Sequence, residues 1–111
     1  TVDQTKAQAL RKNIAAPVVL EVVRNAMRDV VTSGTACCKI EQEVPVKVAG
    51  KTGTAETDPN NKRKPHAWFT SFAPFDNPRV VTVILIENAG EGAQYAAPAT
   101  REILKWYFTH R

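Results

Sequence analysis

The sequence has few of the residues that carry nucleophilic catalysis or metal binding. Its 111 residues include two cysteines, two histidines and two serines. Cys37 and Cys38 are adjacent, and a disulfide between neighbours strains the peptide that joins them. Combined with His66 and His110, they match no spacing typical of a zinc site. We therefore expect two small, half-buried apolar side chains at 37 and 38, no metal site and no cofactor.

Long apolar runs and strong charge are also missing. No segment approaches the roughly 20 apolar residues of a membrane-spanning helix. The net charge is +4, and the one tight basic run, at residues 62–64, has no aromatic residues interleaved with it. Such a run is typical of a solvated loop tip rather than of a nucleic-acid site. Hydrophobic content of 43% and charged content of 23% indicate one ordinary globular unit.

The first half of the chain predicts one helix. Residues 1–16 contain no self-sufficient element and form a poorly defined tail. Pro17 stands where a first helical turn favours proline, and Ser33-Gly34 supplies the stop. Apolar residues recur between them at helical spacing, at Val18, Val22, Ala26 and Val30, flanked by Val19, Val23, Met27 and Val31. We interpret this stripe as packing against a core.

The second half predicts three strands and a final helix. The strands are expected at residues 46–54, 66–74 and 79–87, and short or medium connections make them an antiparallel meander. The third is apolar at odd and even positions alike, which indicates cover on both faces. The helix, at 97–108, would lie on the sheet through a stripe at Ala99, Ile103 and Tyr107, flanked by Thr100, Leu104 and Phe108. The fold class is therefore α+β, an antiparallel three-stranded meander with flanking helices.

The predicted elements do not close a complete core. Two helices cannot cover both faces of the sheet, so the chain is expected to be part of a domain. An exposed sheet edge and incomplete cover predict poor solubility or self-association of the isolated chain.

The stretch richest in chemistry is Lys51-Thr52-Gly53-Thr54, in the first predicted strand. Gly53 leaves one face of the strand bare, so that a ligand or another backbone can approach. The lysine adds a cation, and the threonines add two hydroxyl groups. This combination suits an extended ligand that carries a carboxylate.

An ordered set of short segments surrounds this stretch. They are residues 48–56 (VAGKTGTAE), 66–69 (HAWF), 72–74 (FAP), 76–78 (DNP), 83–90 (VILIENAG) and 96–99 (AAPA). In order and spacing, the set resembles the C-terminal portion of the transpeptidase domain of class B penicillin-binding proteins. The likeness runs from Pro17 to the end of the chain and is nearest to the elongation-type, penicillin-binding protein 2-like enzymes. It implies a partial β-lactamase/transpeptidase-like fold, with residues 1–111 as a C-terminal fragment of that domain.

The resemblance also implies roles for this strand. Lys51 would stabilise the hydrogen bonds around the catalytic serines, and Thr52 and Thr54 would hold the carboxylate of a D-alanyl-D-alanine stem peptide or of a β-lactam. Gly53 would admit that ligand to the strand. The backbone N–H of Thr54 would be one of two oxyanion-hole donors. The parent protein would then cross-link peptidoglycan through an acyl-serine intermediate, on the extracytoplasmic face of the bacterial cytoplasmic membrane and held there by an N-terminal anchor.

The sequence departs from the family at its nucleophile. Ser33 and Ser71 fit neither the Ser-x-x-Lys nor the Ser-x-Asn motif, both of which precede Lys-Thr-Gly in the family. We therefore expect the chain alone to be inactive and the remainder of the domain to be its partner. Two alternatives stay open: a β-lactamase or β-lactam-sensing receptor domain, and a non-catalytic peptide-binding module.

Overall fold

The computed structural model describes residues 8–36, 39–60 and 62–110. Helix α1 spans Pro17–Thr32 and helix α2 spans Lys39–Glu43. Three strands follow, β1 at Ala49–Ala55, β2 at His66–Ala73 and β3 at Val80–Ile86. Helix α3, at Ala96–Thr109, ends the described chain. The prediction for Cys37 and Cys38 falls outside the described residues.

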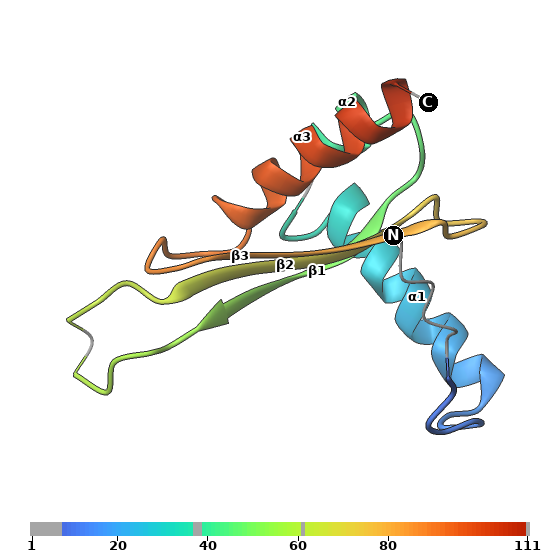
Figure 1. The fold of residues 1–111 in the computed structure, drawn as a ribbon, viewed down its shortest axis with the longest axis horizontal. Coiled ribbons are helices and arrows are strands. Elements are labelled where there is room, and N and C mark those ends of the chain that lie inside the picture. The colour runs from blue at the N-terminus through green and yellow to red at the C-terminus, as the bar shows by residue number, and fades with distance from the viewer. Residues whose placement is uncertain (1–7, 37–38, 61, 111) are drawn as a thin grey trace, which may run out of the picture.

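The three strands form one antiparallel sheet in the order β1-β2-β3. The register pairs Lys51 with Thr70, and Thr70 with Val83 on the far strand. With α3 and α2 on one face and α1 reaching β1 from the other side, this is the predicted α+β meander (Figure 1). The short helix α2 was not predicted, because five residues give no readable helical period.

The core lies between the sheet and α3. Phe69 of β2 and Leu104 of α3 are fully buried and face each other across this layer. The predicted stripe on α3 is confirmed at its flanking residues, since Thr100 and Leu104 are buried and Phe108 packs against the core, whereas Ile103 is 47% exposed. The apolar residues of α3 are numerous enough to fit two neighbouring stripes, and packing on the sheet decides between them.

The predicted core role of the α1 stripe holds only at the C-terminal end of the helix, where Val30 packs against the core and Val31 is buried, and fails over the first turns. Val18 is 70% exposed and Val22 is 64% exposed, and Val31 is the buried residue of the helix. The apolar periodicity forms the helix as expected. Over the first turns of α1, however, no other part of the described chain covers the apolar face.

The second face of β3 is uncovered in the same way. Val81, Val83 and Leu85 are 70%, 60% and 41% exposed, while Val80, Ile84 and Ile86 pack against the core. The prediction that both faces of this strand are covered is therefore not met within the described chain. The expected shortage of cover is what the structure shows.

A salt-bridge cluster fixes α2 against α3. Glu43 lies 3.2 Å from Lys105 and 3.5 Å from Arg101, measured between side-chain oxygen and nitrogen. The hydrogen bond from Lys105 and the nearby Arg101 charge hold the pKa of Glu43 below its usual value. These ion pairs thus join α2 to α3.

Candidate functional site

The predicted site residues lie on the outer strand of the sheet. β1 pairs with β2 on one side only, so its other edge has no strand partner in the described chain. Side chains alternate along a strand, so Lys51 and Gly53 face one side and Thr52 and Thr54 face the other. The four residues thus meet at one open edge but do not share a face.

Lys51 lies on the same side of the sheet as α1. Its ammonium donates a hydrogen bond to the carbonyl of Thr52 at 2.7 Å, and its side chain is exposed. An apolar groove opens beside it, between α1 and the sheet. The groove is lined by Val22, Val23, Ala26, Met27, Val30, Lys51 and Thr70. A cation on the wall of an open apolar groove is available to a ligand or to another part of a larger protein.

The threonines lie on the opposite face, where α3 packs. The hydroxyl oxygen of Thr52 lies 3.0 Å from that of Thr35, in the segment that joins α1 to α2. Either hydroxyl can be the donor, so Thr35 can donate while Thr52 keeps its own proton for a ligand. Thr54 is exposed at the same edge. Sequence reasoning missed Thr35, because no local pattern connects positions 17 residues apart.

Neighbouring atoms lie closer to Gly53 than the sequence indicated. A β-carbon at Gly53 would lie 3.0 Å from the β-carbon of Trp68, its partner on β2. On the other face, a β-carbon at Gly92 would come within 2.1 Å of the Trp68 carbonyl oxygen and 2.6 Å of the Gly53 carbonyl oxygen. Gly92 is therefore required by its close approach to backbone, and at Gly53 there is little room for a β-carbon beside Trp68. The loop before α3 thus supports the middle of β1 from behind.

The two serines are occupied in structural hydrogen bonds. Ser71 is buried and its hydroxyl lies 2.6 Å from that of Thr82 on β3. Ser33 is exposed, and its hydroxyl donates to the Asp29 carbonyl of α1 at 3.4 Å. Nδ1 of His66 accepts the Asn88 N–H at 2.9 Å. Within residues 8–36, 39–60 and 62–110, no serine hydrogen-bonds to a histidine.

The described segments contain neither a metal-binding cluster nor a membrane-spanning helix. Among the described residues, no group of three or more His, Cys, Asp and Glu side chains is placed to hold a metal ion. The helices of the described segments are too short or too polar to cross a membrane.

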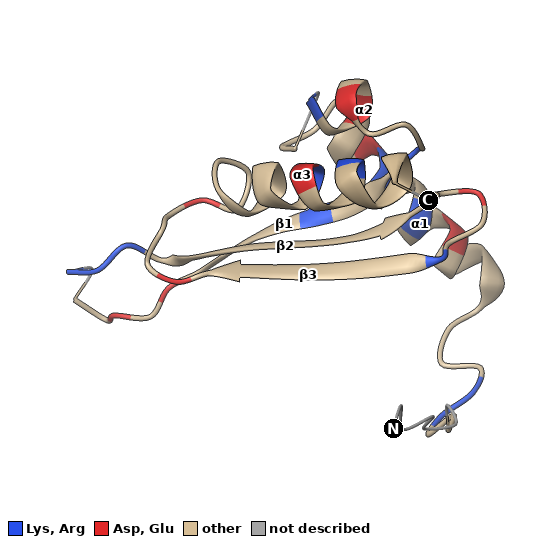
Figure 2. Cartoon of the chain, turned by 45° about the horizontal axis from the view of Figure 1, so that its top comes forward, with Lys and Arg blue, Asp and Glu red and all other residues tan. Residues whose placement is uncertain are grey.

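The loop between β1 and β2 carries charge beyond the end of the sheet. Figure 2 shows a basic segment at its tip, which corresponds to residues 62–64. The carboxylate of Asp58 accepts the backbone N–H groups of Asn60 and Lys62, at 2.9 Å and 3.2 Å. These bonds shape a tight turn in an exposed loop, as the sequence predicted.

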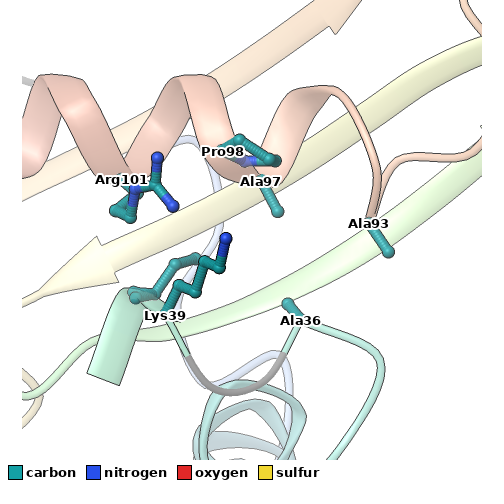
Figure 3. A pocket seen from close by; sticks show the side chains of 7 residues that line it. Ala36, Lys39, Ala93, Ala97, Pro98 and Arg101 are labelled. Atoms are coloured by element: carbon teal, nitrogen blue, oxygen red, sulfur yellow. The ribbon is translucent and has the colours of Figure 1, made fainter. Parts of the chain in front are cut away.

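A separate small hollow lies between α2 and α3. It measures about 130 Å³, and Lys39 and Arg101 extend over an apolar floor that includes Ala97 and Pro98 (Figure 3). Arg101 already forms ion pairs with Glu43 and Glu102, at 3.5 Å and 2.7 Å. The charge of Arg101 is therefore used within the fold, away from the exposed edge of β1.

Comparison with known proteins identifies the family of this chain. The family model of the penicillin binding protein transpeptidase domain matches residues 1–105. The chain belongs to this family of transpeptidase domains.

Relatives and solved structures agree with the match. The chain is 40% identical over 77 residues to the peptidoglycan D,D-transpeptidase MrdA of Haemophilus influenzae, which covers 59% of this chain and 12% of that protein. Penicillin-binding protein 2 of Pseudomonas aeruginosa, solved with WCK 5153, aligns with a TM-score of 0.71 and 32% identity over 82% of this chain and 19% of that chain. A ceftriaxone acyl-enzyme of penicillin-binding protein A from Mycobacterium tuberculosis gives 0.64 and 30% over 82% and 21%.

The coverage values also show what share of each relative the chain matches. The chain spans about an eighth of the length of the curated relative and about a fifth of each solved chain. The predicted resemblance to class B, penicillin-binding protein 2-like enzymes and the partial transpeptidase fold are confirmed.

Proposed function

We propose that the chain is the C-terminal part of the transpeptidase domain of a peptidoglycan D,D-transpeptidase of the elongation type. The observation that carries the proposal is the open edge of β1, which presents the backbone of residues 51–54 with Lys51 beside an apolar groove on one face and Thr52 and Thr54 on the other. Residues 17–111 form the family-like part and residues 1–16 lead into it. The chain supplies one wall of the active site and lacks the nucleophile, because Ser33 and Ser71 serve structural hydrogen bonds.

Each residue of the wall has a proposed role. The hydroxyl groups of Thr52 and Thr54 hold the carboxylate of a D-alanyl-D-alanine stem peptide or of a β-lactam. The Thr54 N–H stabilises the oxyanion of the tetrahedral intermediate, and the open edge of β1 lets the substrate pair with the strand. Lys51 supports the hydrogen bonds of a serine nucleophile from the groove side. The relation to an acyl-enzyme of penicillin-binding protein A supports this chemistry.

The remainder of the transpeptidase domain is the proposed main partner. It would cover the faces of α1 and β3 that this chain leaves open, where Val22 is 64% exposed and Val81 is 70% exposed. That remainder would also bring the serine nucleophile into the groove beside Lys51. Without that cover, the isolated chain is expected to self-associate through its exposed apolar surface and sheet edges.

The cellular setting follows from the proposed reaction. A peptidoglycan cross-linking enzyme works where stem peptides are, on the extracytoplasmic face of the bacterial cytoplasmic membrane. The parent protein would be held there by an N-terminal anchor upstream of the residues in hand. The mild net charge of +4 and the family assignment give no support to a nucleic-acid partner.

Penicillin labelling of the full-length parent protein tests the proposal. We expect one penicillin per molecule to attach covalently and stay attached, and a stem-peptide donor to be cross-linked to an acceptor amine. Rapid consumption of many penicillins per molecule would instead indicate a β-lactamase, and a stable adduct without cross-linking would indicate a receptor. Saturable peptide binding with no adduct would leave the non-catalytic binding module. The 111-residue chain alone should form no adduct.

A further inference from the structure

Arg28 joins three elements at the point where α1 meets the sheet. Its Nη1 donates a hydrogen bond to the carbonyl of Val48 at 2.8 Å, and its side chain is 14% exposed. Val48 is fully buried and directly precedes β1. The guanidinium therefore connects the second half of α1 to the backbone that begins the candidate site strand.

The other side of the same guanidinium is held by α2. Nη2 of Arg28 forms a charge-assisted hydrogen bond and ion pair with Glu41. That hydrogen bond holds the pKa of Glu41 below its usual value, so the carboxylate stays ionised at neutral pH. Arginine is a planar fork with fixed donor directions, so two partners define its orientation. Its two partners thus fix the orientation of Arg28, and Arg28 in turn holds α1, α2 and the start of β1 together.

The start of β1 has direct consequences for the site. Lys51 is three residues beyond Val48, and the same α1 helix that carries Arg28 forms the apolar wall of the groove beside Lys51. Further along β1, the Thr35 hydroxyl contacts Thr52, and the Gly92 backbone lies against Gly53. The strand is therefore fixed at its middle by these two contacts and at its start by Arg28.

We propose that Arg28 is a positioning residue, which sets the separation of α1 and β1 and thereby the place of Lys51 at the edge of the strand. This inference rests on the proposed function. Loss of the two bonds lets the start of β1 shift relative to α1. The hydroxyl groups and the N–H that hold a substrate then move with it, and a misplacement of about 1 Å can cost about 100-fold in rate.

Variants of the full-length parent protein test this role. Arg28→Met keeps the apolar stem and removes both bonds, and Arg28→Lys keeps a single cation that cannot hold both partners in one plane. Glu43→Gln is the matched control, because it weakens ion pairs between α2 and α3 and changes none of the groups that bond to Arg28. The measurements are the acylation rate constant at saturating penicillin and hydrogen exchange across residues 49–55.

The expected results separate positioning from general support. Arg28→Met should slow acylation by about 10-fold to 100-fold and speed exchange in β1, with Arg28→Lys intermediate. Glu43→Gln should stay within about twofold of the wild type, because it loses partly exposed ion pairs. Wild-type rates in both Arg28 variants, or equal slowing in Glu43→Gln, would overturn the inference. A parent that is never acylated would refute the proposed function, and exchange in β1 would still decide the role of Arg28.

Discussion

Replacing Lys51 with alanine in the full-length parent protein should slow acylation by penicillin by about 10²-fold to 10³-fold. The side chain is exposed on the groove wall, and its ammonium lies 2.7 Å from the Thr52 carbonyl oxygen at the edge of β1. In the proposed site, this cation stabilises the hydrogen bonds of the attacking serine. Removing it takes away charge stabilisation that water cannot replace once the remainder of the domain and the ligand close over the groove.

Folding stability should be almost unchanged in the same variant. The Lys51 side chain is exposed and its hydrogen bond goes to the adjacent residue, so the free energy of unfolding should change by less than about 0.5 kcal/mol. Lys47→Ala is the matched control: it removes another exposed lysine, one that pairs with Asp76 at 3.5 Å. Unchanged acylation in Lys51→Ala, or equal loss in Lys47→Ala, would contradict the role given to Lys51.

Gly92→Ala is expected to damage both the fold and the site. The added carbon would lie 2.1 Å from the Trp68 carbonyl oxygen and 2.6 Å from that of Gly53, and both are backbone atoms that cannot rotate away. Overpacking of this kind costs about 1–3 kcal/mol of unfolding free energy. Because Gly53 lies in the site strand, acylation should slow as well.

Thermal unfolding and penicillin labelling of the parent protein check this prediction together. Ala93→Ser is the neighbouring control, since Ala93 borders the hollow between α2 and α3 and has room for one more atom. A Gly92→Ala protein with wild-type melting temperature and wild-type acylation would show that the loop does not support β1. Such a result would leave the open edge of β1 as the site but remove its backing.

Local patterns predicted the elements of this fold and misjudged what covers them. Strands and the two long helices follow from periodicity and from stops such as Gly34, and the structure confirms them. The α1 stripe and the outward face of β3 also have apolar periodicity, yet Val22 and Val83 are exposed. Periodicity reports that a face needs cover, and it cannot report whether the covering segment lies in the same chain.

In the candidate site, too, the local residues were predicted and the distant ones were not. Lys51, Thr52, Gly53 and Thr54 are contiguous, so one motif predicted them, and the antiparallel sheet places them on its open edge. Their roles stay predictions. The residues that hold this strand in place come from far along the chain: Arg28 by a hydrogen bond, Thr35 by a hydroxyl contact and Gly92 by backbone approach. No spacing in the sequence signals these contacts.

The most direct test of the account is to locate the residue that penicillin acylates. The full-length parent would be labelled, digested and analysed by mass spectrometry. The account predicts a single acylated serine upstream of residue 1, in a Ser-x-x-Lys motif, with Ser33 and Ser71 unmodified. An adduct on Ser33 or Ser71 would contradict it, because the chain would then carry its own nucleophile.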